Sequence, residues 1–124
     1  MSSRLRAILI VACAALVTGC SSLTSPVVCT TEARAGIAVQ VLDSSSNAAV
    51  GEGATITARD GAFVQTAGTS EDYPGPYGLA YERAGVYTVT VQQEGYAIWT
   101  RNDVRVTHDE CHVHTVQLTA LLQP

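Results

Sequence analysis

The sequence predicts an all-β protein, a single antiparallel β-sandwich of about seven strands that follows an N-terminal signal helix. Three observations favour this fold class. Beyond residue 36 the apolar side chains recur at every second position, which is the period of a strand and not of a helix. Turn sequences separate these alternating runs at intervals of about eight to twelve residues. No Pro-, Gly- or Ser-rich linker divides the runs, so one domain is expected.

Residues 1–19 have the organisation of a secretory signal peptide. Arg4 and Arg6 give a positive start, and the apolar run Ala7–Val17 follows them. That run is too short to span a bilayer as a helix and has the length of a signal-peptide core. We therefore expect this segment to be removed from the mature protein.

The segment Leu16–Cys20 (LVTGC) resembles a bacterial lipobox, which consists of an aliphatic residue, small residues and a cysteine. The resemblance implies cleavage after Gly19 and acylation of Cys20. Two or three acyl chains on one cysteine anchor a protein far more firmly than one chain does. Residues 20–34 would then be the lipidated cysteine and its tether. Ser21 stands where an aspartate would favour retention in the inner membrane, so we expect the periplasmic face of the outer membrane.

The charge of the chain argues against several classes of partner. All seven basic residues are arginines, and cleavage would leave five of them against 11 acidic residues, a net charge of −6. Nucleic-acid binding and a polybasic membrane patch both need a dense cationic surface. We therefore expect no nucleic-acid partner and membrane attachment through lipid alone.

Two cysteines remain for the folded domain once Cys13 is removed and Cys20 is acylated. In an oxidising compartment, Cys29 and Cys111 are expected to form a disulfide with Cα atoms about 5–6 Å apart. Such a bond would close a loop of about 80 residues and contribute about 4.5 kcal/mol at most. Two buried thiols or one metal site are the alternatives.

The first three strands are expected over residues 37–41, 54–58 and 63–66. In the first, Ile37, Val39 and Val41 alternate with smaller or polar residues. A polar turn over 43–47 ends it, and Asp60-Gly61 between the second and third is a hairpin signal. A loop over 68–78, rich in proline and glycine, then follows.

The last four strands are expected over residues 77–82, 86–92, 98–106 and 111–122. Tyr87 lies on the same face of its strand as Val89 and Val91, so its ring should be buried. A buried hydroxyl needs a hydrogen-bond partner, as in a tyrosine corner. The 98–106 strand should be interrupted near Asn102-Asp103. In the last strand the apolar residues change from odd positions, Cys111 and Val113, to even positions from Val116 onward. We therefore expect a bulge near His114 or Thr115.

Three stretches resemble the carboxypeptidase regulatory-like domain, which has a prealbumin-like (transthyretin-like) sandwich of the immunoglobulin-like type. They are Gly36–Asp43, Ala84–Val91 with its G-x-Y-x-V-x-V spacing, and the Glu94-Gly95-Tyr96 turn. The resemblance covers residues 35–124 as one domain. Asp109–Val113 resembles lipoprotein members of the family. Family domains are accessory modules, so the resemblance implies neither catalysis nor a cofactor.

Two clusters could carry chemistry. His108, His112 and His114 lie close in sequence, and the last two would share one face of a strand, where they could bind zinc or copper. A solvated polar strand start is the plainer interpretation. The loop Thr69–Tyr77 is acidic and aromatic, a composition suited to binding a partner. Nucleophile, metalloprotease and phosphate-loop motifs are missing from the sequence.

These observations predict a non-enzymatic, lipid-anchored envelope protein that binds an envelope protein or glycan. The alternatives are a periplasmic metal-binding protein built on the three histidines and a carrier of a small ligand.

Overall fold

The computed structural model describes residues 26–124, so the expected signal helix and Cys20 lie outside the described residues. The described part is all-β, as predicted, and none of it forms a helix that could cross a membrane. It has seven strands, which are β1 (Ile37–Asp43), β2 (Thr55–Asp60), β3 (Phe63–Ala67), β4 (Tyr77–Leu79), β5 (Gly85–Gln92), β6 (Trp99–Val106) and β7 (Val116–Leu122).

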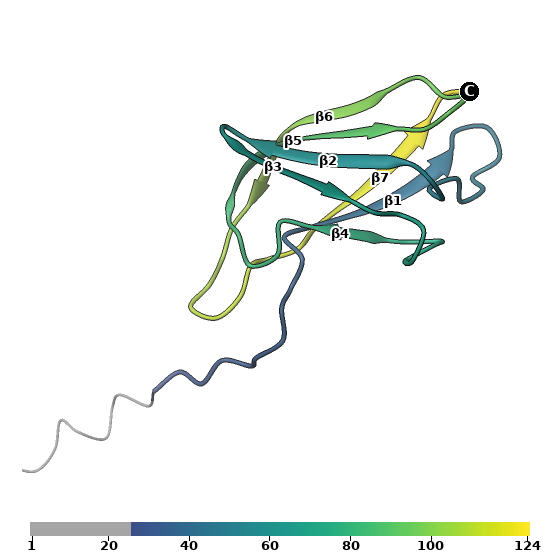
Figure 1. Cartoon of the computed structure of the whole chain (residues 1–124). Coiled ribbons are helices and arrows are strands. Elements are labelled where there is room, and N and C mark those ends of the chain that lie inside the picture. Colours follow the sequence, from purple (N-terminus) through teal and green to yellow (C-terminus); the bar gives the residue numbers. More distant parts are fainter. Residues whose placement is uncertain (1–25) are drawn as a thin grey trace, which may run out of the picture.

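The strands form two sheets that pack face to face (Figure 1). One sheet has the order β4-β1-β7 and the other has the order β3-β2-β5-β6. All neighbouring strands are antiparallel except β1 and β7, which run parallel over seven matched positions. The expectation of a purely antiparallel sandwich is therefore wrong at this pair. The first and last strands need no hairpin between them, because the rest of the chain makes the crossover.

The core lies between the sheets and is built from the alternating positions that the sequence indicated. Every second side chain of β1, β5 and β7 is buried, and the intervening ones face outward. The strand residues that are buried are Ile37, Val39, Val41, Ile56, Ala58, Tyr77, Leu79, Tyr87, Val89, Val91, Val104, Val106, Leu118, Ala120 and Leu122.

Tyr87 forms the corner that its sequence position predicted. Its ring is buried, and its hydroxyl donates to the carbonyl of Arg83, four residues upstream, at 2.8 Å. The Arg83 guanidinium donates to the same hydroxyl at 2.9 Å and pairs with Asp60 at 3.0 Å. It also lies 4.0 Å from the centroid of the Phe63 ring. This cluster ties the β2–β3 hairpin to the start of β5.

Two strands are shorter than predicted. β4 ends at Leu79 because Ala80 and Glu82 have left-handed backbones, with φ of 54° and 51°. β7 begins at Val116, because residues 108–113 fold back on themselves through a bridge between His108 and Val113. A bulge near His114 or Thr115 was expected from the sequence, to explain why the apolar positions change from odd to even numbers in the last strand. The turn formed by residues 108–113, and not a bulge, accounts for this change.

The interruption expected in β6 is present. The β5–β6 register shifts between Tyr87 and Val89, and Asp103 on β6 has a φ of 54°. The two-residue turn after Asp60 is present too, with Gly61 at a φ of 57°. A φ of this sign favours glycine, which accounts for the residue at this turn.

The sandwich has two distinct ends (Figure 1). The chain enters at what we call the tether end, which also holds the β4–β5 and β6–β7 connections. The opposite end, which we call the loop end, carries the β1–β2, β3–β4 and β5–β6 loops, residues 44–54, 68–76 and 93–98. This arrangement gives each candidate site its place.

Candidate functional sites at the two ends of the sandwich

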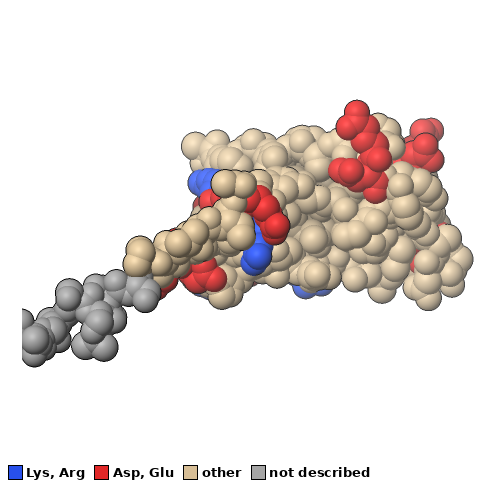
Figure 2. Space-filling view, turned by 90° about the horizontal axis from the view of Figure 1, so that it is seen from below, with Lys and Arg blue, Asp and Glu red and all other residues tan. Residues whose placement is uncertain are grey.

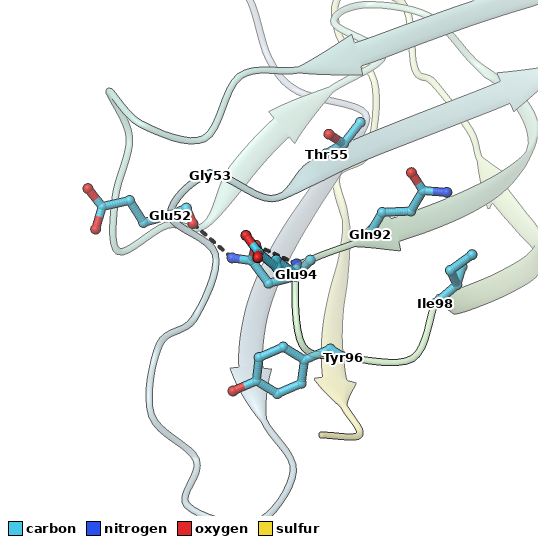
Figure 3. Close-up of a pocket in the computed structure, with 8 residues that line it drawn as sticks. Glu52, Gly53, Thr55, Gln92, Glu94, Tyr96 and Ile98 are labelled. Carbon is cyan, nitrogen blue, oxygen red and sulfur yellow. Dashed lines mark hydrogen bonds between the residues drawn. The ribbon is translucent and has the colours of Figure 1, made fainter.

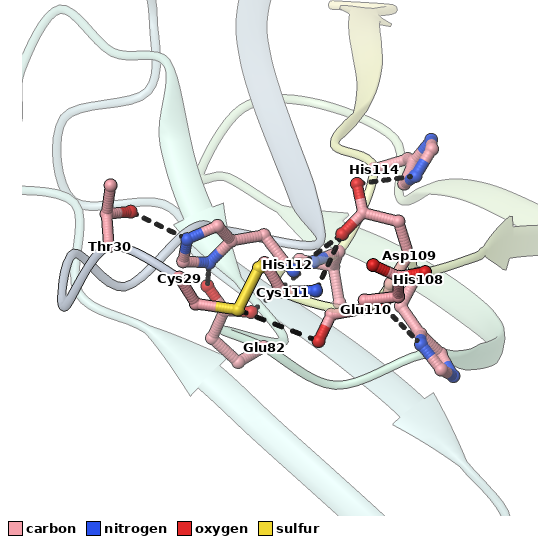
Figure 4. The surroundings of a disulfide bond; sticks show 10 residues. Cys29, Thr30, Glu82, His108, Asp109, Glu110, Cys111, His112 and His114 are labelled. Atoms are coloured by element: carbon pink, nitrogen blue, oxygen red, sulfur yellow. Dashed lines mark hydrogen bonds and ion pairs between the residues drawn. A yellow bond between two sulfur atoms is a disulfide. The ribbon is translucent and has the colours of Figure 1, made fainter. Parts of the chain in front are cut away.

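A disulfide joins Cys29 to Cys111 at the tether end, with the Cα atoms 5.1 Å apart (Figure 4). Both the pairing and the separation agree with the sequence prediction. Cys29 lies in the segment before β1, whereas Cys111 lies in the β6–β7 connection and not in a strand. The bond therefore fixes the entering chain to the last connection of the sandwich.

His112 lies beside this disulfide at the centre of a chain of hydrogen bonds (Figure 4). Its side chain is only 9% exposed. Its Nδ1 is 2.6 Å from Oε1 of Glu82, and its Nε2 is 2.7 Å from the hydroxyl of Thr30. Three segments that are far apart in sequence meet at this one imidazole ring.

Backbone amides hold the Glu82 carboxylate in place. The N–H of Arg34 donates to Oε1 at 2.8 Å, and the N–H of Val113 donates to Oε2 at 3.3 Å. The amide of Arg34, followed by the His112 side chain, lowers the pKa of Glu82 below its ordinary value of 4.5. The left-handed backbone of Glu82 turns this residue toward the entering chain just after β4.

The order hydroxyl, imidazole, carboxylate is also the order found in serine hydrolases. A nucleophile needs a cavity at its reacting oxygen and donors for an oxyanion. The open concavity here, about 360 Å³, is lined by Glu82, His112 and the 108–113 segment, and Thr30 is not among its lining residues. The geometry thus fits a structural tie between the tether and the sandwich.

The other two histidines do not join His112. His114 is exposed and lies 3.4 Å from Oδ2 of Asp109, while His108 Nδ1 bonds the Asp109 carbonyl at 2.9 Å. The expectation that His112 and His114 share one strand face is wrong, because neither lies in β7. Among residues 26–124, no group of three or more His, Cys, Asp or Glu side chains converges as metal ligands.

Asp109 explains why this segment turns. One of its carboxylate oxygens accepts the N–H groups of Cys111 and His112, at 2.8 and 3.0 Å. These two amides lower the pKa of Asp109, with the His112 amide contributing more. This is a short aspartate-capped turn, and its signal in the sequence is an aspartate two residues before Cys111.

The loop end is acidic. Its three loops contain four carboxylates and no basic residue, and Asp43 adds a fifth at the end of β1. The four in the loops are Glu52, Glu71, Asp72 and Glu94. Figure 2 shows acidic groups gathered at the end of the molecule opposite the entering chain. The sequence singled out only the two in the 68–76 loop, because folding is needed to bring the three loops together.

An open recess of about 470 Å³ lies at the loop end between the β1–β2 and β5–β6 loops (Figure 3). Gln93 joins these loops, since its side-chain amide donates to the carbonyls of Val50 and Glu52 at 2.6 and 2.8 Å. The Tyr96 hydroxyl donates to Asp43 at 2.8 Å, which raises the pKa of Tyr96 and lowers that of Asp43.

The acidic, aromatic loop after β3 presents only part of its aromatic surface. Tyr73 is 46% exposed, whereas Tyr77 at the start of β4 is completely buried. The side chain of Gln40 on β1 holds the loop by donating to the Pro74 carbonyl at 2.7 Å. The buried Thr69 hydroxyl holds its other side by donating to the Ala54 carbonyl at 2.9 Å.

No protein-family model matches the chain, and no curated protein matches it significantly in sequence.

Proposed function

We propose that the protein is a lipid-anchored lipoprotein of the bacterial cell envelope and acts there as a non-enzymatic interaction module. The lipobox-like segment ending at Cys20 motivates the anchor. The observation that carries the proposal is the division of the domain into a cross-linked tether end and an acidic loop end.

The two ends define an orientation for an anchored domain. Cys20 precedes Cys29 by nine residues, which extend over about 30 Å at most. An anchor at Cys20 would therefore keep the tether end near the lipid and direct the loop end into the compartment. The Ser21 residue supports the periplasmic face of the outer membrane as that location.

The chemistry of the loop end favours a partner with basic groups. The five carboxylates attract cationic groups and repel anionic ones, and none of the three loops contains a basic residue. The half-exposed ring of Tyr73 adds a rigid apolar contact that loses little entropy on binding. The partner class that fits is an envelope protein with a basic surface or a glycan that carries amino groups.

The resemblance to the carboxypeptidase regulatory-like domain remains part of this proposal. Seven strands in sheets of three and four, with the resembling stretches Gly36–Asp43 and Ala84–Val91 in β1 and β5, support a prealbumin-like arrangement. Such domains are accessory modules, which agrees with a binding role.

The metal-binding alternative has weaker support. Both ring nitrogens of His112 are engaged by Glu82 and Thr30, and His108 and His114 bond within their own turn. A small-ligand carrier would use the recess at the loop end, which is open and mostly polar in its lining.

The anchor is tested by replacing the proposed acylation site. In the native host, Cys20→Ser should leave an uncleaved precursor without lipid, visible by mass spectrometry. The wild-type protein should enter the outer-membrane fraction and label with a clickable palmitate. A wild-type protein that is freely soluble, with a mature N-terminus other than Cys20, would contradict the proposal.

The interaction surface is tested with a photoreactive amino acid at one of two exposed positions. Tyr73 lies at the loop end, and Val64, which is 47% exposed, lies near the start of β3 beside the β2–β3 turn and serves as the matched position away from the loop end. Cross-links in living cells should form from position 73 and should weaken in a Glu52→Gln, Glu94→Gln background. Equal products from both positions would exclude the loop end as the binding surface.

A further inference from the structure

In the part of the chain that the structure describes, three of the five arginines make no ion pair with a carboxylate. Arg34 pairs with Glu32, and Arg83 pairs with Asp60. The three others are Arg59, Arg101 and Arg105, and all of them lie on the β3-β2-β5-β6 sheet. In a domain with 11 acidic residues, the unpaired positive charge is therefore concentrated on one sheet.

Two of these arginines lie on the outer face of that sheet, as the strand register shows. Arg59 lies opposite Thr88 of β5, which faces outward because both of its neighbours in the chain are buried or core-facing. Arg105 lies opposite Val86, the preceding outward position of β5. Both arginines are exposed. Since strands are about 4.8 Å apart and alternate residues about 6.8 Å apart, the two Cα atoms are about 12 Å apart.

An exposed valine lies beside each of these arginines. Val64 on β3 lies opposite Arg59 and is 47% exposed. Val86 lies opposite Arg105 and is 38% exposed. We call these four residues the arginine–valine patch. A surface that is both basic and apolar suits the boundary between lipid headgroups and acyl chains.

The patch lies on the part of the sheet nearest the tether end. Gly85 begins β5 and Val106 ends β6 at that end, and these two residues are directly paired. The β2–β3 turn lies at the same end of the sandwich (Figure 1). Each residue of the patch is next to the terminal residue of its strand at this end.

The four strands of the sheet contain only two carboxylates, Asp60 and Asp103. Asp60 lies opposite Phe63 on the inner side of the sheet and pairs with Arg83 at 3.0 Å. Asp103 lies in the irregular part of β6 and has no matched position on β5. The sheet thus carries three unpaired arginines against one unpaired carboxylate, so its outer face attracts anions.

We propose that the arginine–valine patch contacts the headgroup phosphates of an anionic bilayer and thereby holds the domain with its loop end directed away from the lipid. This contact depends on the proposed lipid anchor at Cys20, whose tether of about 30 Å at most keeps the tether end near the surface. Guanidinium groups form paired hydrogen bonds with phosphate oxygens. The same negative surface repels the five carboxylates of the loop end.

The patch orients the domain and does not anchor it. Binding to an anionic membrane by charge alone takes clusters of about four to eight basic residues, and the patch has two. The acyl chains therefore remain the attachment, as the sequence predicted. The arginines add a preferred orientation to a domain that the tether alone would leave free to rotate.

The first test reports where the patch lies. The full acylated chain is placed in vesicles of phosphatidylcholine, with or without phosphatidylglycerol, and carries a polarity-sensitive dye on Val64→Cys. The dye has one target, because Cys29 and Cys111 form a disulfide and Cys20 would be acylated. Its emission should shift to shorter wavelength only in the vesicles that contain phosphatidylglycerol. The same dye on Thr119→Cys, at an exposed position of the other sheet, should not shift.

The second test removes the charge. Arg59→Gln combined with Arg105→Gln should abolish the shift of the dye at position 64, whereas Arg101→Gln should retain it. Arg101 is the matched control because it lies opposite the buried Val89, and its guanidinium is 5.4 Å from the centroid of the Trp99 ring. A thermal unfolding transition like that of wild type shows that each variant still folds.

Salt separates a lipid surface from a site for a phosphate ion. Sodium chloride should remove the shift because it screens exposed charges, and inorganic phosphate at equal ionic strength should have no greater effect. Stronger displacement by phosphate, an equal shift in both kinds of vesicle, or equal loss in Arg101→Gln would overturn the contact. So would a protein cross-link, in place of a lipid adduct, from a photoreactive residue at position 64 in cells.

The anchor and the contact fail in different ways. An acylated chain that floats with both kinds of vesicle but shows no shift overturns the contact alone. A chain that carries no acyl group and does not float with vesicles overturns the anchor, and the contact with it.

Discussion

Gly51 lies directly against the ring of Tyr77, and this contact accounts for the glycine. A Cβ atom at position 51 would lie 2.5 Å from the Tyr77 ring and 2.6 Å from its hydroxyl oxygen. The ring is completely buried, and its hydroxyl has no hydrogen-bond partner among the described residues. The alternation pattern predicted β1 and β2 but could not indicate which residue fills the space between their loop and the core.

Gly51→Ala should therefore destabilise the domain by about 1–3 kcal/mol, because the rigid ring must move to admit the methyl group. The free energy of unfolding from a urea titration measures this. Gly68→Ala is the matched control, since a Cβ atom there meets nothing within 4 Å. Equal losses at the two positions would show that the Tyr77 contact is not the cause.

Glu82 makes stability depend on pH in a predictable direction. Its pKa in the folded protein is lowered from 4.5, first by the Arg34 amide and then by His112. A lowered pKa means that the carboxylate stabilises the fold above about pH 4.5 and that this stabilisation disappears as the pH falls through the folded value. At low pH the protonated side chain resembles glutamine.

The difference in unfolding midpoint between wild type and Glu82→Gln should thus be largest at neutral pH and should shrink as the pH falls below about 4.5 and through the lowered pKa of the folded protein. Urea midpoints across this range measure it. Glu71→Gln, at an exposed loop carboxylate that accepts no hydrogen bond from the described residues, should follow wild type throughout. A constant difference for Glu82→Gln would indicate that its packing, and not its charge, matters.

At the scale of single elements, strict alternation of apolar and polar residues predicts the positions of the strands well. β1 and β5 lie where the pattern placed them, because one face of each is buried and the other is not. The pattern was wrong where polar backbone contacts decide the structure. Asp109 turns the 108–113 segment through two amide hydrogen bonds, and the left-handed residue Ala80 ends β4 early.

The disulfide links two non-strand segments, and its loss should weaken the domain without abolishing the fold, since the core lies between the strands. Reduction removes a constraint that contributes about 4.5 kcal/mol at most, which corresponds to a fall in Tm of well over ten degrees. Thermal unfolding followed by circular dichroism, with and without a reductant, measures it. Two maleimide-reactive thiols in the unfolded but unreduced wild type would contradict the bond itself.

At the scale of the whole molecule, the sequence predicted the all-β class and the Cys29–Cys111 pairing. It could not predict the hydrogen-bonded chain Thr30–His112–Glu82, whose members are 30 or more residues apart in the sequence. The parallel β1–β7 pair was missed for a related reason. The two-residue period of the apolar side chains indicates which face of a strand is buried, but it does not indicate which strand lies beside it.

The bond between Cys29 and Cys111 also determines how much of the tether can separate the sandwich from Cys20. With the bond closed, the nine residues from Cys20, the proposed acylation site, to Cys29 can extend over about 30 Å at most. With the bond open and the Thr30 and Arg34 contacts released, the free chain would run on to Gly36, a span of about 55 Å. If Cys20 is acylated, the redox state of this one disulfide would therefore nearly double the length of the tether, which is the largest distance between the lipid and the tether end of the sandwich.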